Sequence, residues 1–346
     1  MIATLIFLFA AFTGLAQAKS VVYVSNAEDG TIGLYALDPD KGSLTPQGVV
    51  EAGAAPMPMA VSPDRHFLYV AMRKEPFRVI SFAIGQDGGL TKKDETPLPD
   101  NMAYIATDRS GRWLFGASYF GDKVSVSPTG AEASQLLATG RNAHSILADP
   151  TNRFVFAANL GADQILQYRF DADSGKLSEN DPALIKTESG EGPRHMVFSP
   201  DGRFLYVLGE LKGDVLQFAI DPKTGTLRQT ATAPSIPSES VPAKIWAADL
   251  KITPDGRFLY ASERTASRIA LLSLEGNTPR LISTIPTEIQ PRGIALSPSG
   301  HFLVASGEKS DQISLYRIDE KTGALTRTAR APGGKGANWV EIIELP

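Results

Sequence analysis

Six segments of the chain repeat one pattern of apolar and polar positions: two short alternating runs joined by a turn of Ser, Pro, Asp, Gly or Asn. The segments span residues 60–72, 106–118, 147–159, 198–210, 252–264 and 296–308. Alternation with a period of two predicts half-buried strands, and the turn residues predict tight hairpins. The copies recur roughly every 40 to 55 residues, which indicates a repeat architecture.

Each hairpin is followed by a third alternating run and, in most copies, by a fourth that opens with Gly-x-Leu. The copy beginning at residue 147 continues with QILQYRF (164–170) and then with GKLSEN (175–180). Four strands with short connections must be antiparallel, and a repeated four-stranded unit is typical of a propeller blade.

The two ends of the chain supply one further unit between them. Residues 21–37 match the second and third strands, and residues 40–48 match the fourth. The missing innermost strand is matched by WVEIIE (339–344). We therefore predict an all-β fold: a seven-bladed β-propeller over residues 19–346, closed by pairing of the C-terminal strand with the N-terminal blade. Closure removes exposed sheet edges.

The first 18 residues differ from the rest of the sequence. An apolar run from Ile2 to Leu15 ends in Ala16-Gln17-Ala18, a small-x-small cleavage pattern, and the run is short for a membrane span. We expect a signal peptide over residues 1–18, cleaved after Ala18, and a periplasmic protein. The alternatives are a membrane anchor, or a wrongly assigned start codon and a cytoplasmic protein.

Composition excludes several classes of function. The chain of 346 residues contains no cysteine, so disulfides, thiol nucleophiles and thiolate metal sites are excluded. A net charge of -4 gives no electrostatic reason to expect nucleic acid or an anionic membrane as partner. We expect a monomer with no stable membrane association after signal cleavage.

The repeats differ most from one another at one end of the predicted central channel. The innermost strands line this channel, so residues just before the first strand and just after the second strand of each blade converge on one pocket. The charged and polar candidates there are Arg73, His144, Arg194, His195, Glu210, Asp249, Arg264, Gln290, Arg292 and Lys309. For the two histidines a structural role is equally open, and Asp249 has the alternative of tying neighbouring blades together.

Three stretches carry a family resemblance: GPRHMVFSPDG (192–202), IWAADLKITPDGRFLYASERTAS (245–267) and TEIQPRG (287–293). They strongly resemble the seven-bladed propeller lactonases typified by bacterial 6-phosphogluconolactonase, with fungal carboxymuconate cyclases as more distant relatives. The resemblance covers the chain after Lys19 and implies lactone chemistry without metal or cofactor. Residues proposed as functional in the cyclase branch correspond here to His144, Arg194, Glu210 and Arg264. The sequence departs from the family at Gly209, where asparagine is usual.

The expected reaction is hydrolysis of a sugar lactone such as glucono-1,5-lactone. Glu210 or His144 would activate water, and Arg194 and Arg264 would hold the oxyanion. The other candidates, predicted to bind substrate, are Arg73, His195, Asp249, Gln290, Arg292 and Lys309. The sequence has no G-x-S-x-G elbow, which argues against Ser145 as a nucleophile. Two alternatives remain: a cytoplasmic 6-phosphogluconolactonase of the pentose phosphate pathway, and a non-catalytic binding propeller of the cell envelope.

Overall fold

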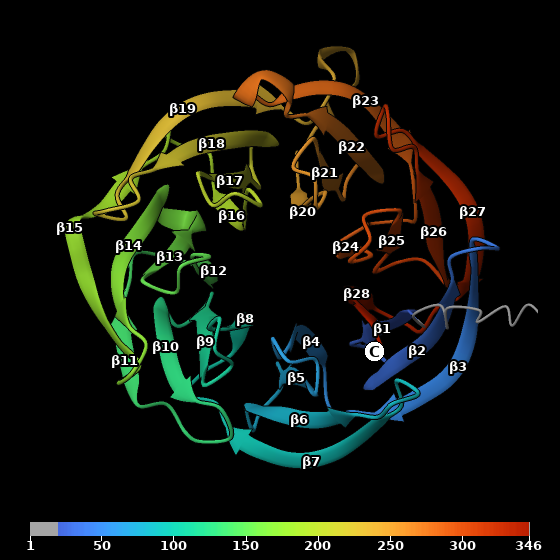
Figure 1. Ribbon diagram of the computed structural model, residues 1–346, viewed down its shortest axis with the longest axis horizontal. Helices are drawn as coiled ribbons and strands as arrows, with labels where there is room; N and C mark the ends of the chain where they lie inside the picture. The colour runs from blue at the N-terminus through green and yellow to red at the C-terminus, as the bar shows by residue number, and fades with distance from the viewer. Residues whose placement is uncertain (1–19, 346) are drawn as a thin grey trace, which may run out of the picture.

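The structure is a computed structural model that describes residues 20–345, and these residues form seven four-stranded antiparallel sheets arranged in a ring (Figure 1). The predicted signal peptide lies outside the described residues, so its cleavage stays a prediction. Within residues 20–345, no helix is long and apolar enough to span a membrane. The helical segments are three 3-10 turns: η1 (Leu160–Ala162), η2 (Ser238–Ser240) and η3 (Glu275–Asn277).

The four strands of each blade lie side by side, in order outward from the central channel. The innermost strands are β4 (Pro56–Val61), β8 (Met102–Thr107), β12 (Ala143–Ala148), β16 (Pro193–Phe198), β20 (Ala247–Ile252), β24 (Ile294–Leu296) and β28 (Ala337–Glu344). The second strands are β1 (Ser20–Asn26), β5 (Phe67–Met72), β9 (Trp113–Ser118), β13 (Phe154–Asn159), β17 (Phe204–Gly209), β21 (Phe258–Glu263) and β25 (Phe302–Ser306).

The third and fourth strands form the outer half of each blade. The third strands are β2 (Thr31–Asp38), β6 (Arg78–Ile84), β10 (Lys123–Pro128), β14 (Gln164–Asp171), β18 (Asp214–Ile220), β22 (Arg268–Ser273) and β26 (Gln312–Ile318). The fourth strands are β3 (Ser43–Glu51), β7 (Leu90–Pro97), β11 (Gln135–Ala138), β15 (Lys176–Lys186), β19 (Leu227–Pro234), β23 (Arg280–Pro286) and β27 (Leu325–Pro332).

The ring closes as the sequence predicts. Strand β28 pairs antiparallel with β1, from Ser20 opposite Glu344 to Val24 opposite Val340, so one sheet combines both ends of the described chain. This pairing confirms both the seven-bladed fold and the assignment of the C-terminal strand as the innermost strand of the first blade.

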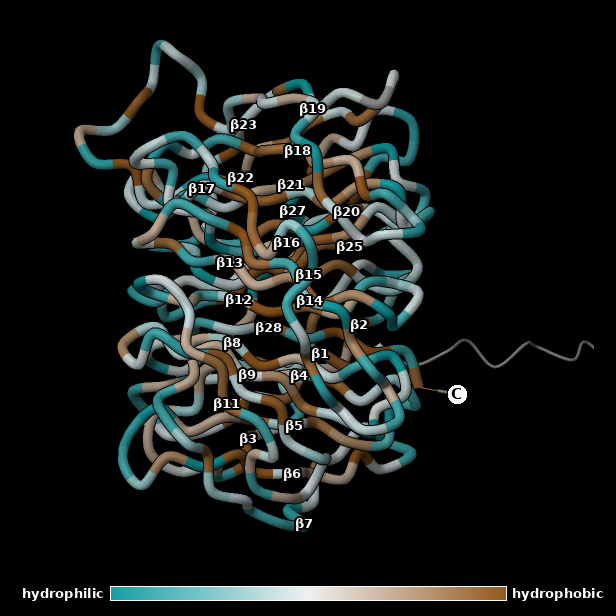
Figure 2. The backbone as a smooth tube through the Cα atoms, turned by 90° about the vertical axis from the view of Figure 1, so that its left-hand side faces the viewer, coloured by the Kyte–Doolittle hydropathy of each residue, from teal (hydrophilic) through white to brown (hydrophobic). Residues whose placement is uncertain are grey.

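Apolar residues alternate along the strands and pack between adjacent blades. In Figure 2 hydrophobic residues lie mainly along the strands, while the connecting turns are mostly hydrophilic. One such contact joins Phe156 of β13 to Phe198 of β16 in the next blade, with ring centroids 6.0 Å apart. Since both faces of a sheet are buried in this way, each blade depends on its neighbours for a complete core.

The repeated Ser-Pro-Asp-Gly turn is held by its own side chains. Ser199 donates its hydroxyl hydrogen to Asp201 (2.6 Å) and accepts the amide of Phe204 (2.9 Å). Gly202 has a φ of 70°, a left-handed conformation that glycine adopts without strain. The turn therefore fixes the register of the hairpin that carries the site.

The innermost strands begin earlier than the sequence pattern predicts. We expected the rim residues to precede the first strand, but Arg194 and His195 lie within β16. Pro193 pairs with Gly209 and Met196 with Val207, so these two residues oppose Leu208 alone. This irregularity is a β-bulge, which redirects side chains at the end of a strand. The innermost strand pairs of five other blades have similar register shifts, and the hairpin pattern alone does not reveal them.

Candidate active site

A cavity of about 240 Å³ opens at the end of the channel where the bulges lie. The residues that line it are Arg73, Ala103, Tyr119, Phe120, His144, Glu210, Trp246, Arg264 and Arg292. Three larger cavities lie elsewhere among the described residues. Those of about 620 and 680 Å³ have neither histidine nor arginine in their walls. The third, of about 310 Å³, is lined by Arg257 and His301, but both side chains are exposed and each pairs with a surface glutamate. Among the described residues the rim cavity therefore brings together the groups suited to acid–base and oxyanion chemistry.

Glu210 lies between two buried arginines. The Nε atom of Arg194 and an Nη atom of Arg264 each donate to its Oε2 oxygen, and both distances are 2.8 Å. Glu210 directly follows β17, Arg264 directly follows β21 and Arg194 lies in the bulge of β16, so two adjacent blades build the cluster. Because the carboxylate accepts two charge-assisted bonds, its position is fixed.

The arginines are themselves held by backbone carbonyl groups. Arg264 donates to the carbonyls of Trp246 (3.0 Å) and Ala247 (3.1 Å), and its guanidinium carbon lies 3.8 Å from the centroid of the Trp246 ring. Arg194 is completely buried and donates through Nη1 to the carbonyl of Ala248. Its other terminal nitrogen, Nη2, has no partner within the described residues.

Both arginines remain cationic at neutral pH. Burial, followed by repulsion from Arg292, lowers the pKa of Arg194 to about 10. Burial, followed by repulsion from Arg194, lowers the pKa of Arg264 to about 9. The negative charge of Glu210 opposes both decreases. The cavity therefore presents fixed positive charge where an oxyanion could develop.

His144 lies in β12 and its ring packs edge-on against two others. The centroid distances are 5.7 Å to Tyr119 and 5.3 Å to His195. Burial lowers the pKa of His144 well below its ordinary value, and the positive charges of Arg194 and other neighbours lower it further. His144 is therefore neutral at neutral pH, as a proton acceptor must be.

His195 and Asp249 lie beneath the cavity rather than in its wall. His195 Nδ1 is 2.8 Å from Asp249 Oδ1, and the Lys251 ammonium donates to both Asp249 oxygens at 2.8 and 2.9 Å. Asp249 also accepts the backbone amide of Ile294 at 3.2 Å, which joins blade β20–β23 to blade β24–β27. The carboxylate therefore ties blades together, the alternative role considered for it from the sequence.

The remaining candidates are divided between the cavity and its surroundings. Arg73 and Arg292 line the cavity, and Arg292 lies 3.7 Å from Glu308. Gln290 donates to Glu308 at 2.9 Å, while Lys309 points outward to Glu28 at 3.2 Å. Gln290 and Lys309 are not among the residues that line the cavity. Their predicted contact with substrate therefore has no support from the geometry.

Three aromatic residues that line the cavity are not among the site residues predicted from the sequence. They are Tyr119 and Phe120, after β9, and Trp246, before β20. Their positions at the strand ends are the same signal that identified the charged candidates, but Phe120 and Trp246 are not ionisable, and burial raises the pKa of the Tyr119 phenol. Phe120 is 73% exposed, so it offers an apolar surface beside the polar groups.

Two further observations limit the chemistry. The Ser145 hydroxyl donates to the carbonyl of Arg194 at 2.5 Å, so it is engaged in joining β12 to β16. Among residues 20–345 no group of three or more His, Asp or Glu side chains is arranged to hold a metal ion. Beside its aromatic residues, the described site offers arginines, a carboxylate and a neutral histidine for chemistry.

Comparison with known proteins agrees with this fold. Residues 21–342 match the family model described as lactonase, 7-bladed beta-propeller. The chain is 40% identical to the 6-phosphogluconolactonase of Pectobacterium carotovorum over 94% of this chain and 99% of that protein. It is also 40% identical to that of Serratia proteamaculans, with the same coverage.

A solved structure, the periplasmic gluconolactonase of Pseudomonas aeruginosa, superposes with a TM-score of 0.86 at 26% sequence identity. That match covers 95% of this chain and 100% of that one. The chain therefore belongs to the seven-bladed β-propeller lactonase family, and it is a lactonase.

Proposed function

We propose that the protein hydrolyses an unphosphorylated aldonolactone such as glucono-1,5-lactone to the aldonic acid, in the rim cavity and without a metal. The observation that carries the proposal is the convergence of Glu210, Arg264 and neutral His144 on one cavity, with Arg194 behind them. Hydrolysis of a cyclic ester needs a base for water, a cation for the oxyanion and a proton for the ring oxygen.

The roles follow from position and charge. Arg264 faces the cavity and would polarise the lactone carbonyl and hold the negative oxygen of the tetrahedral intermediate. Arg194 fixes Glu210 and supports that charge from behind. Both arginine bonds to Glu210 end on Oε2, so Oε1 is the oxygen that water or a sugar hydroxyl would approach. Either Glu210 or His144 would remove the proton from water.

Two observations support an unphosphorylated substrate. The apolar N-terminal run with its Ala16-Gln17-Ala18 pattern favours export, and phosphorylated sugars are cytosolic intermediates. The Pseudomonas aeruginosa structure is named as a periplasmic gluconolactonase. We therefore propose that the mature protein acts in the periplasm after removal of residues 1–18.

A second candidate substrate is 6-phosphogluconolactone, and the charge of the cavity favours it. Arg73 and Arg292 stand beside the Arg194–Glu210–Arg264 cluster, and Glu308 is the carboxylate 3.7 Å from Arg292. Arginine is well suited to bind phosphate. The 40% identical relatives named 6-phosphogluconolactonase point the same way.

Lactone opening followed in a pH-stat tests the site, after subtraction of the spontaneous reaction. Both lactones are supplied to the wild type and to Glu210→Gln, His144→Ala and Arg264→Ala. We expect each substitution to lower kcat by roughly 10²-fold or more. Near-wild-type turnover by all three variants on the better substrate would contradict the assignment.

Cell fractionation tests the substrate and the location together. Periplasmic and cytoplasmic extracts of cells expressing the full chain are assayed with both lactones, and the N-terminus of the purified protein is sequenced. Activity on glucono-1,5-lactone in the periplasm, with an N-terminus at Lys19, supports the first candidate. Activity confined to the cytoplasm on the phosphorylated lactone overturns it in favour of the second.

A further inference from the structure

Two ring nitrogens in the site are buried without a hydrogen-bond partner: Nδ1 of His144 and Nε2 of His195. A buried polar atom left unpaired costs roughly 1–3 kcal/mol, so such atoms call for an explanation. The two rings are neighbours, with centroids 5.3 Å apart and planes inclined by 63°. One water molecule, or a modest rotation of the His144 ring, could join the two nitrogens.

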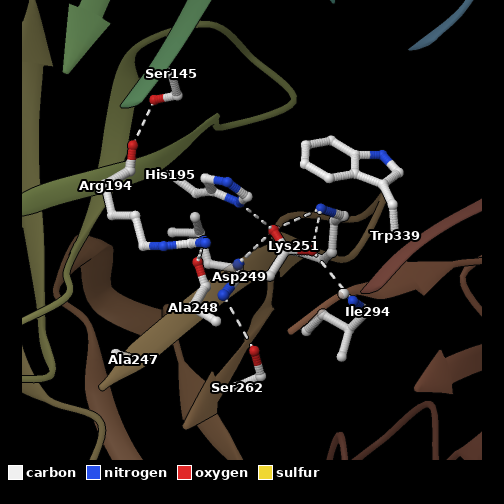
Figure 3. Close-up of polar contacts among 12 residues, drawn as sticks. Ser145, Arg194, His195, Ala247, Ala248, Asp249, Lys251, Ser262, Ile294 and Trp339 are labelled. Atoms are coloured by element: carbon white, nitrogen blue, oxygen red, sulfur yellow. Dashed lines mark hydrogen bonds and ion pairs between the residues drawn. The ribbon is translucent and has the colours of Figure 1, made fainter. Parts of the chain in front are cut away.

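The far side of the His195 ring is firmly anchored. Figure 3 shows Asp249 approached by His195 from one side and by Lys251 from the other. The rings of Tyr104 and Trp339 pack near the imidazole, with centroids 5.1 and 5.5 Å away. His195 therefore has little freedom to change its orientation.

The charges around Asp249 determine the tautomer of His195. Burial would raise the pKa of Asp249, but Lys251 and His195 outweigh it and hold that pKa well below its ordinary value. Burial, followed by repulsion from Arg194, lowers the pKa of His195 to about 3. An ionised Asp249 beside a neutral His195 requires the proton on Nδ1, which leaves the lone pair on Nε2.

We propose that Asp249 and His195 form a relay behind His144 that fixes the tautomer of His144 and stabilises the proton it accepts during lactone hydrolysis. The inference rests on the proposed function. His195 Nε2 accepts a hydrogen bond from His144 Nδ1–H, directly or through one water. The lone pair of His144 Nε2 is then the one available to the cavity, and His144 is the base.

The relay accounts for a difficulty in using His144 as a base. Protonating this ring places a new positive charge in a buried site near Arg194, His195, Arg292 and Arg264, and all four of these residues lower its pKa. His195 can favour the proton only in its neutral form, as a hydrogen-bond acceptor. The anionic Asp249, acting through His195, offsets part of that cost. His195 and Asp249 are positioning residues here, since neither lines the cavity.

The proton balance of the reaction closes without another reagent. Water loses one proton to His144 Nε2 as its oxygen bonds to the carbonyl carbon. The bond between that carbon and the ring oxygen then breaks, and the ring oxygen takes the proton back from His144. The product is the open acid, which ionises in solution.

His195→Asn removes the proposed hydrogen bond with His144 but keeps the hydrogen bond to Asp249. The asparagine amide can still donate to Asp249 from the position of Nδ1, but it offers no acceptor at the position of Nε2. We expect kcat on the better lactone to fall about 10²-fold, with KM within about twofold. The thermal midpoint should fall as well, because asparagine is smaller than the imidazole packed against Tyr104 and Trp339. His195→Gln, which places an amide oxygen near the position of Nε2, should retain more activity than His195→Asn.

Ser262→Ala is the matched control for a general disturbance of β20, the strand that carries Asp249. The Ser262 hydroxyl accepts the backbone amide of Asp249 at 3.0 Å without contacting either imidazole. This variant should lower the thermal midpoint while kcat stays close to wild type. A wild-type kcat in His195→Asn, or an activity order of Asn above Gln, would overturn the relay.

Nitrogen-15 chemical shifts of the imidazoles in the wild-type protein give a test that needs no variant, and the chain has four histidines to assign. The relay requires His195 and His144 both protonated on Nδ1 at neutral pH, and an Nε2–H tautomer of either ring overturns it. If the wild type opens neither lactone, the proposed function fails. If the wild type is active and Glu210→Gln is impaired while His195→Asn is not, only the relay fails.

Discussion

Glu191 offers a direct test of the electrostatics next to the site. It precedes β16 and is 1% exposed, and its Oε1 oxygen has no partner within the described residues. The Lys212 ammonium lies 3.9 Å from its Oε2 oxygen. Burial, followed by repulsion from Asp214, raises the pKa of Glu191 to about 7. The carboxyl is therefore partly protonated in the folded protein at neutral pH.

The consequence for stability can be worked out from this pKa. Below the ordinary value of 4.5 the carboxyl is protonated in both folded and unfolded chains. Between 4.5 and about 7 the unfolded chain loses the proton while the folded protein keeps it, so stability falls as pH rises. Each unit of pKa is worth about 1.4 kcal/mol, so the full decrease is about 3 kcal/mol.

Glu191→Gln removes this titration while keeping the shape of the side chain. We expect the variant to be more stable than wild type by about 1–3 kcal/mol at pH 8. The difference should shrink toward zero near pH 4.5. Urea unfolding at a series of pH values between 4.5 and 8 measures this difference, provided both proteins unfold in one transition with equal m-values.

Glu188→Gln is the matched control, because Glu188 also pairs with Lys212, at 2.9 Å, but its side chain is 81% exposed. An exposed pair contributes little, so this variant should follow the wild-type curve. A Glu191→Gln variant whose stability also follows the wild-type curve from pH 4.5 to 8 would refute the argument that Glu191 is held protonated by burial.

Three further predictions test the site and the scaffold. Arg264→Lys should lower kcat by about 10²-fold, because an ammonium cannot reproduce the contacts with Glu210 and Trp246. The pH-stat assay measures this loss of kcat, and an unchanged circular dichroism spectrum shows that the variant is folded. Gly209→Ala should destabilise the protein by about 1–3 kcal/mol in thermal unfolding, since its Cβ would lie 1.8 Å from Glu191 Oε1, and an unchanged midpoint would contradict this. Deleting residues 337–346 removes β28 and should abolish cooperative unfolding in calorimetry, because β1 loses its innermost partner.

The fold could be predicted because several independent local patterns in the sequence indicate the same arrangement of strands. The hairpins, the Gly-x-Leu runs and the C-terminal WVEIIE each specify a strand through a local pattern, and β28 pairs with β1 as that pattern requires. The beginnings of the innermost strands could not be predicted in the same way. A bulge such as that at Arg194 and His195 depends on pairing with β17 and leaves no periodic signal.

The candidate site was only partly predictable for a related reason. Position in the repeat brings a residue to the rim, and it correctly placed Glu210 and Arg264 there. It does not specify the direction of the side chain. Arg264 directly follows β21 and faces the cavity, whereas Lys309 lies three residues beyond the end of β25 and turns outward to Glu28. Asp249, at the start of β20, points toward Lys251. Those directions depend on the charges that each side chain meets in three dimensions.

The scaffold repeats seven times, but the chemistry is concentrated in adjacent blades. Glu210 and Arg194 belong to the blade of β16–β19, and Arg264 belongs to the blade of β20–β23. The 2.8 Å bond between Arg264 and Glu210 crosses one blade boundary, and Arg73, His144 and Arg292 reach the same cavity from three other blades. The repeated hairpins give each rim position the same height in the channel. Different side chains at equivalent positions then meet in one plane, and this is how a repeated sequence builds an asymmetric site.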